Sequence, residues 1–178
     1  MSKELEIVSV KLNRYDKLMA DRAIESPEDA VALLGEFLRD MDREVLCVVN
    51  LRADGVPINC NIVSVGALNE TVAHPREILK SSILSNAASI LIVHNHPSGS
   101  LIPSQADTMM TDRMIKVCNY MGIPLRDHII VGGKNEGYFS FKTKGLLKTE
   151  DIMLVNNYRD ISFDDKGKDE KITKGRKR

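Results

Sequence analysis

Two histidines, a serine and an aspartate near the middle of the chain have the residue types and spacing of a metal site. One residue separates His94 from His96, and seven residues separate His96 from the Ser-x-x-Asp pattern of Ser104 and Asp107. If extended backbone continues through His96, the side chains at i and i+2 point the same way and both imidazoles can share one ion. Two neutral imidazoles and a carboxylate satisfy the rule for catalytic zinc, in which three protein ligands leave a position for water. The sequence therefore predicts one zinc ion per chain, held by His94, His96 and Asp107.

Each of these residues also has an ordinary structural explanation. A Ser-x-x-Asp pattern by itself is more often a helix cap, and a single histidine at the end of a strand is more often structural. The combination at fixed spacing favours the metal site. Ser104 could cap the helix through its oxygen, or it could donate its hydroxyl to the reacting group, where such a donor is typically worth about 3 kcal/mol.

The segments on either side of this site are expected to position it. Residues 89–93 form a short, continuous apolar run, which is typical of a strand that is covered on both faces. The prolines and glycine that follow predict a loop, and Ser104 has the position of a helix start. In a helix from Ser104, Asp107 shares one face with several apolar residues, so its carboxylate would be costly to bury unless it is paired or bound to a metal. These apolar residues are Met110, Met114, Val117, Cys118 and Met121.

The remaining segments predict alternating helices and strands. Ser26, Pro27 and the two acids that follow are typical of a helix start, and apolar residues recur at helical spacing as far as Met41. His74 precedes a proline at another helix start and is expected to be a cap or a surface residue. Further strands are expected over 5–12, 45–51, 56–65, 125–131 and 138–141, with a helix from 74 to about 86. This alternation predicts an α/β sandwich with a mixed sheet and the site at the carboxyl end of a strand.

Composition narrows the class of protein without naming a substrate. The 178 residues are 43% hydrophobic and 28% charged, which suits one domain with an adequate core plus peripheral sequence. The 25 basic and 25 acidic residues cancel, so no overall charge favours nucleic acid or a membrane as partner. No signal peptide or membrane-spanning run is evident, and we expect a cytoplasmic protein. Cys47, Cys60 and Cys118 lie far apart in apolar contexts and are interpreted as reduced thiols.

The end of the chain differs in character from the rest. Residues 163–178 alternate between acidic and basic and finish on a basic cluster, which predicts a mobile tail. The basic cluster could contact nucleic acid, but a solvated tail is the simpler expectation. The oligomeric state has no signature in the sequence.

The site residues resemble a known family. The spacing His-x-His, seven residues, Ser-x-x-Asp is that of the JAMM (JAB/MPN-plus) metalloprotease motif, and the string HNHPSGSLIPSQAD at 94–107 is similar to its RadC-like branch. Further segments agree with that branch, namely HPREIL at 74–79, NAASILIVHNHPSG at 86–99 and PLRDHIIVGG at 124–133. The resemblance covers about residues 27–145. It implies a three-layer, cytidine-deaminase-like JAB/MPN domain at 26–147, between an extension at 1–25 and a tail at 148–178.

The resemblance also implies an activity. JAMM proteins hydrolyse peptide or isopeptide bonds with metal-activated water, so the expected substrate is a protein or a peptide. In that family a glutamate from an early strand acts on the water, and Glu44 stands at the matching position. Without the resemblance, Glu44 would be interpreted as a solvated charge at the end of a strand. Glu70, Glu77 and Glu136 are weaker candidates for this role.

Alternative functions were weighed against the same residues. A zinc nucleobase deaminase requires His-x-Glu and Pro-Cys-x-x-Cys, and neither occurs. The three consecutive residues His94, Asn95 and His96 do not indicate an HNH nuclease, because the residues of that motif are spread over a longer ββα-metal unit. The competing class is a non-catalytic or DNA-repair-associated binding module that keeps the metal site. Longer RadC-like proteins carry an amino-terminal helix-hairpin-helix segment, and no such segment is expected before residue 27 here. This weakens the DNA-binding alternative, so binding to a protein partner is the main alternative to catalysis.

Asp127 and His128 follow on a later predicted strand and have two interpretations. They could contact the site histidines from behind, since ligating histidines commonly donate their other N–H to an acceptor. A purely structural hydrogen bond is the more ordinary expectation.

Overall fold

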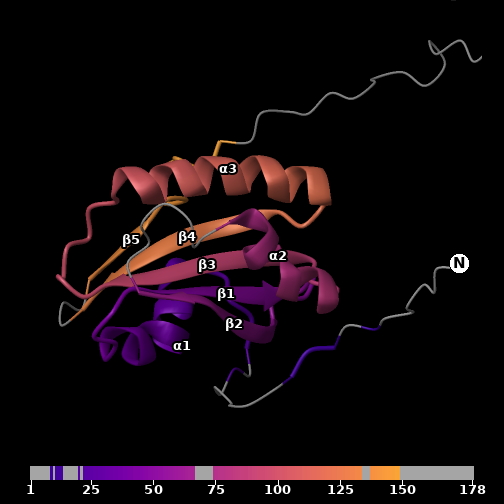
Figure 1. Ribbon diagram of the computed structural model, residues 1–178, viewed down its shortest axis with the longest axis horizontal. Helices are drawn as coiled ribbons and strands as arrows, with labels where there is room; N and C mark the ends of the chain where they lie inside the picture. The colour runs from indigo at the N-terminus through magenta and orange to yellow at the C-terminus, as the bar shows by residue number, and fades with distance from the viewer. Residues whose placement is uncertain are drawn as a thin grey trace, which may run out of the picture.

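Five strands form one mixed sheet in the computed structural model (Figure 1). The structure describes residues 9, 11–13, 20, 22–66, 74–133 and 137–148. The strands are β1 (Val45–Leu51), β2 (Pro57–Val65), β3 (Ser89–His96), β4 (Leu125–Gly132) and β5 (Tyr138–Ser140). Their order in the sheet is β2-β1-β3-β4-β5, and β3 and β4 are parallel while the other neighbours are antiparallel.

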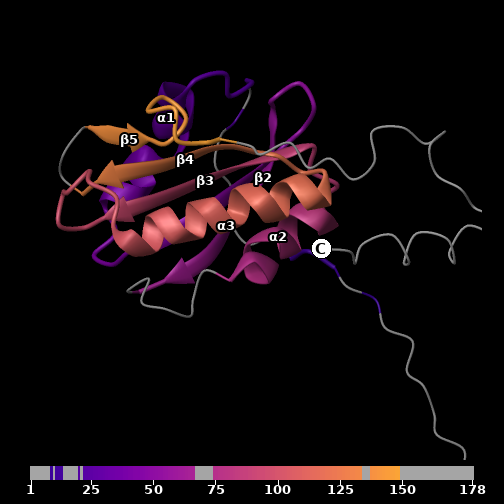
Figure 2. The same cartoon turned by 90° about the horizontal axis from the view of Figure 1, so that it is seen from above.

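Among the described residues, three helices cover the two faces of this sheet. They are α1 (Pro27–Arg39), α2 (Pro75–Leu84) and α3 (Gln105–Met121). The first helix lies on one face, and α2 and α3 lie on the other, as the two views in Figures 1 and 2 agree. The structure thus has the three layers of the expected α/β sandwich, which confirms the predicted fold class.

The alternation of side chains along β1 and β3 divides the core into two halves. Val93 packs with Leu34 and Leu38 of α1, whereas Ile90 and Ile92 pack against α2 and α3. Successive residues of a strand point to opposite faces, so the even-numbered positions of β3 face α3. His94 and His96 continue that even-numbered series, which places their rings between the sheet and α3.

The ends of the helices follow from the residues that cap them. Ser26 and Asp29 form a capping box at the start of α1, and Gly122 ends α3 in the left-handed conformation at φ 66°. His74 is the N-cap of α2 and accepts a hydrogen bond from the backbone N–H of Arg76, so it is a cap as expected.

Several expectations concern parts of the chain that the structure leaves undescribed. Most of the strand expected over 5–12 and all of the tail beyond Lys148 lie outside the described residues. Within the described ranges, Cys47, Cys60 and Cys118 are free thiols, and no helix combines the length and apolar character that crossing a membrane requires.

Candidate metal centre

The two predicted histidine ligands share the end of one buried strand. The strand β3 continues through His96, so the extended backbone that aligns the two rings is present. The Nε2 atoms of His94 and His96 lie 3.1 Å apart, and neither residue is more than 7% exposed. The prediction that both imidazoles face one point is confirmed.

Asp107 reaches the same point from the first turn of α3. Its Oδ1 atom lies 3.2 Å from His94 Nε2, and its Oδ2 atom lies 3.4 Å from His96 Nε2. One ligand atom from each of these residues lies within 4.8 Å of the others. The strand and the helix therefore bring together the three residues that the spacing predicted.

Hydrogen bonding shows that this donor set fits a cation. The Nδ1 atom of His96 lies 2.8 Å from the carbonyl oxygen of Ser100. A carbonyl oxygen can only accept a hydrogen bond, so Nδ1 carries the proton. In the neutral ring, Nε2 then has a free lone pair. Asp107 Oδ1 is buried and makes no hydrogen bond to any described residue. A buried lone pair and a buried, unbonded carboxylate oxygen in one cluster of ligand atoms are costly unless a positive charge lies between them. The donor types and the count fit zinc.

The protonation of the ligands reflects the same contacts. Burial raises the pKa of Asp107, but its contacts with His94, His96 and the Ser104 hydroxyl outweigh burial and hold that pKa well below its usual range. The contact with Asp107 raises the pKa of His96, assisted by the Ser100 carbonyl and opposed by burial. Asp107 is therefore anionic, as a carboxylate ligand must be, and a proton on His96 Nε2 would compete with a metal ion.

Glu44 lies next to this cluster from the start of β1. The antiparallel register pairs Leu46 with His94, which brings the first residues of β1 to the end of β3. Glu44 Oε1 lies 3.8 Å from His96 Nε2, and the Glu44 side chain is 28% exposed. A carboxylate in this position can contact both the ligand cluster and solvent, which is what a proton-transferring group needs.

Of the other candidate glutamates, the structure describes Glu77, which has a role away from the cluster. Glu77 lies in the first turn of α2, where it pairs with Lys80. Glu70 and Glu136 fall outside the described residues.

Asn95 is a contributor that the sequence did not reveal. It lies between the two histidines, so its side chain points to the opposite face of the sheet, where it is fully buried. Its Oδ1 accepts from the backbone N–H of Val45 at 2.7 Å, and its Nδ2 donates to the carbonyl of Arg43 at 3.0 Å. These two bonds hold the backbone on both sides of Glu44. The only signal for this role in the sequence was an amide side chain between two histidines at the end of a strand that begins as an apolar run.

Ser104 has the capping role in this structure. Its hydroxyl accepts from the backbone N–H of Asp107 at 3.1 Å and donates to Asp107 Oδ2 at 2.7 Å. The backbone N–H of Ser104 donates to the same oxygen, which completes a capping box. The single hydroxyl proton is thus directed to the carboxylate, and a bond from Ser104 to a substrate oxygen would have to replace this one.

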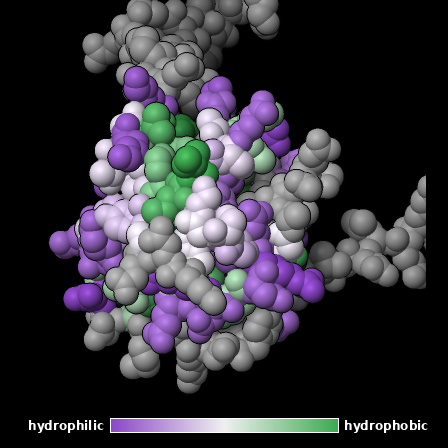
Figure 3. Space-filling model, turned by 90° about the vertical axis from the view of Figure 1, so that its left-hand side faces the viewer, coloured by the Kyte–Doolittle hydropathy of each residue, from purple (hydrophilic) through white to green (hydrophobic). Residues whose placement is uncertain are grey.

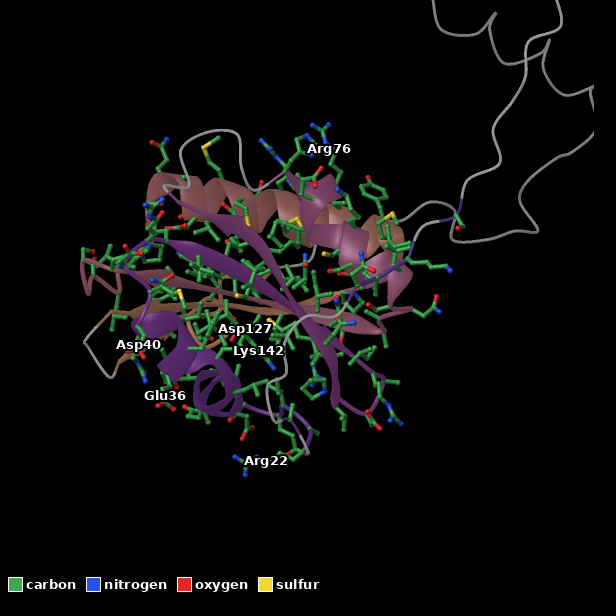
Figure 4. All side chains as sticks on the ribbon, turned by 60° about the horizontal axis from the view of Figure 1, so that its bottom comes forward. Arg22, Glu36, Asp40, Arg76, Asp127 and Lys142 are labelled. Carbon is green, nitrogen blue, oxygen red and sulfur yellow. The ribbon has the colours of Figure 1, made fainter. Side chains whose placement is uncertain are left out.

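Asp127 and His128 have separate roles because neighbouring residues of β4 point to opposite faces. Asp127 lies on the side of α1, beside Lys142 (Figure 4), and accepts from the Ser140 hydroxyl at 2.6 Å and from the Lys142 backbone N–H at 2.9 Å. This is a structural role. His128 instead lies behind His94, with its Nε2 atom 2.8 Å from His94 Nδ1.

The surface around the start of α3 is partly apolar. Figure 3 shows the end of the molecule where α3 begins, and apolar side chains gather on part of it. Ile102 is 78% exposed and Met109 is 56% exposed, and both are close in sequence to Ser104 and Asp107.

Gly133 supports the loop that follows His96, which leads to a testable prediction. Its backbone N–H donates to the His96 carbonyl at 2.9 Å, and a Cβ atom at this position would lie 2.8 Å from the carbonyl oxygen of Pro97. Gly133→Ala must shift the backbone beside a ligand, so we expect a loss of about 1–3 kcal/mol in the free energy of unfolding and weaker zinc binding.

The matched control is Gly35→Ala in α1, where the atoms nearest to the new Cβ belong to the side chains of Val31 and Arg39 rather than to the backbone. Chemical denaturation and zinc titration of both variants measure the two effects. Equal zinc affinity in the two variants would show that the close approach of Gly133 does not position the ligand.

Comparison with known proteins agrees with this geometry. The family model for the RadC-like JAB domain matches residues 24–146. A UPF0758 protein of Desulforamulus reducens is 42% identical over 124 residues, and one of Clostridium acetobutylicum is 44% identical over 125 residues; both alignments cover 70% of this chain. The alignments cover 54% and 53% of those relatives, so the chain spans about half the length of the curated relatives it matches. A more distant relative from Methanosarcina mazei is 36% identical over 127 residues, with 71% of this chain and 55% of the relative covered. The chain belongs to the RadC-like JAB domain family.

Proposed function

We propose that this protein is a zinc-dependent hydrolase that cleaves an amide bond, either a peptide or an isopeptide bond. The observation that carries the proposal is the meeting of His94, His96 and Asp107 at one buried point with a carboxylate beside it. Glu44 Oε1 lies 3.8 Å from the Nε2 atom of His96, one of the ligand atoms. Membership of the RadC-like JAB family and the JAMM spacing of the residues support the choice of amide hydrolysis.

The chemistry of the ligands favours zinc. Imidazole nitrogens combined with a carboxylate, in a set of three that leaves a coordination position open, are typical of catalytic zinc sites. A bound zinc ion supplies Lewis acidity, which lowers the pKa of water to about 7 and polarises a carbonyl group.

The residues of the chain have distinct roles in this proposal. Glu44 accepts a proton from the attacking water and delivers it to the leaving amine, a transfer that typically contributes about 10²–10⁴-fold in rate. Asn95 holds the backbone on both sides of Glu44, so the carboxylate keeps its place beside His96. Ser104 positions Asp107 through the capping box, and its hydroxyl stabilises the negative oxygen of the tetrahedral intermediate when it turns from Asp107 to the substrate.

A peptide library tests this proposal directly. The zinc-loaded protein is expected to cleave a subset of peptides or isopeptide-linked peptides, and a chelator should stop the cleavage. The matched control is the His94→Ala, His96→Ala double variant, which should be inactive whether or not zinc is added. Zinc binding by the wild type without any chelator-sensitive cleavage, together with a stable complex with a protein partner, would refute the hydrolase and favour the binding module.

A further inference from the structure

We propose that Thr111 and His128 form a hydrogen-bond relay behind His94 that fixes the tautomer and the position of the His94 ring. This proposal rests on the proposed zinc site, since the relay acts on one of its ligands. His128 and Thr111 are positioning residues, because both lie behind the ligand and neither presents an atom to the ligand cluster.

The relay consists of three consecutive hydrogen bonds. His94 Nδ1 lies 2.8 Å from His128 Nε2, and His128 Nδ1 lies 2.6 Å from the hydroxyl oxygen of Thr111. The Thr111 hydroxyl in turn lies 2.6 Å from the carbonyl oxygen of Asp107. The chain of bonds therefore starts at one ligand, on β3, and ends at another, on α3.

The direction of every proton follows from the last bond. A backbone carbonyl can only accept, so the single hydroxyl proton of Thr111 is donated to Asp107. The hydroxyl oxygen must then accept from His128, which places a proton on His128 Nδ1. In a neutral ring this leaves His128 Nε2 as an acceptor, and His94 must donate to it from Nδ1. The neutral His94 ring therefore presents a free lone pair on Nε2, the atom that faces Asp107 and His96.

Burial isolates this relay from solvent, and the one nitrogen that it leaves without a partner, His94 Nε2, is the atom that faces Asp107 and His96. His94 and His128 are fully buried and Thr111 is 2% exposed, so water cannot replace a lost partner. The His128 ring stacks on Phe141 with the ring centres 4.7 Å apart and the planes 3° from parallel, which holds the plane of the His128 ring. The opposite tautomer of His94, with its proton on Nε2, would require His128 to reverse as well and to accept from the Thr111 hydroxyl. The Thr111 oxygen would then lie 2.6 Å from the Asp107 carbonyl oxygen with no hydrogen between them, which is unfavourable.

The second histidine of the proposed site, His96, also has its tautomer fixed by a hydrogen bond from Nδ1. His96 donates its Nδ1 proton to the backbone carbonyl of Ser100 at 2.8 Å, so its tautomer is fixed by the main chain. His94 has a side-chain acceptor instead, which a substitution can remove. Partners of this kind orient a ligating histidine and increase its basicity, and their loss typically weakens metal binding by about 10–100-fold.

The test compares Thr111→Val with Thr111→Ser in a zinc competition titration against a chelator. Valine has nearly the shape of threonine but no hydroxyl, so it removes the acceptor for His128 Nδ1, whereas serine retains it. We expect zinc binding about 10–100-fold weaker in Thr111→Val and close to wild type in Thr111→Ser. Equal affinity in Thr111→Val and the wild type would overturn the proposal.

Nitrogen-15 NMR of the zinc-free wild type provides a measurement that needs neither a variant nor zinc. At about pH 8.5, roughly two units above the ordinary imidazole pKa, both His94 and His128 should carry their proton on Nδ1. A proton on Nε2 of His94 would overturn the relay even if Thr111→Val failed to fold. Failure of the wild type to bind zinc would instead refute the proposed function, while these spectra would still decide whether the relay exists.

Discussion

Replacing Glu44 by glutamine is expected to abolish amide hydrolysis while the protein keeps its zinc. Glutamine has nearly the same shape but cannot accept a proton, and loss of a general base typically costs about 10²–10⁴-fold in turnover. Glu44 lies beside His96 without belonging to the His94, His96 and Asp107 set, so the variant should still bind one equivalent of zinc. Turnover and metal content are measured on the same preparation.

Glu77→Gln is the matched control for this prediction. Glu77 lies on α2 and pairs with Lys80, so its replacement should leave both hydrolysis and zinc content unchanged. Undiminished turnover in Glu44→Gln would show that another group transfers the proton. Loss of zinc in Glu44→Gln would show that Glu44 is itself a ligand.

Asp107→Asn is expected to remove zinc binding while the fold is retained. The oxygen of the new amide can accept the two bonds that Ser104 donates to Asp107, and its nitrogen can donate to the bare Nε2 of His94. The substitution also removes a buried carboxylate oxygen that has no hydrogen bond to any described residue. The zinc-free variant should therefore be at least as stable as the zinc-free wild type.

Thermal unfolding with and without zinc measures this effect. Free zinc at about 100 times its Kd should stabilise the wild type by about 2.7 kcal/mol and leave Asp107→Asn unchanged. Asp112→Asn, on the exposed side of the same helix, is the control and should respond to zinc like the wild type, because Asp112 is exposed and pairs with Lys116. Equal stabilisation of Asp107→Asn and the wild type would exclude Asp107 as a ligand.

The sequence was sufficient for the parts of the site that depend on local periodicity. The two-residue period of a strand aligned His94 with His96, and the helical period put Asp107 on the buried face of α3. The capping pattern of Ser104 and Asp107 is likewise a local signal, and the capping box is present. The same periods predicted the α/β layers, because the helices and the four longer strands extend over enough residues to show their patterns, whereas β5 has only three.

Contacts between distant elements could not be derived in the same way. Glu44 was found through the resemblance alone, since the pairing of β1 with β3 that brings it to His96 is a tertiary feature. Asn95 was not singled out, because its bonds reach residues about fifty positions away. His128 was a candidate with two open interpretations, and only the packing of α3 against β4 places it between His94 and Thr111.

Zinc content is the most direct test of the central claim that His94, His96 and Asp107 form a zinc site. Elemental analysis of purified protein, reconstituted with zinc and then dialysed, should give about one zinc per chain. The His94→Ala, His96→Ala double variant, treated identically and shown to be folded, should give almost none. A wild type without zinc, or a double variant with full zinc content, would contradict the account.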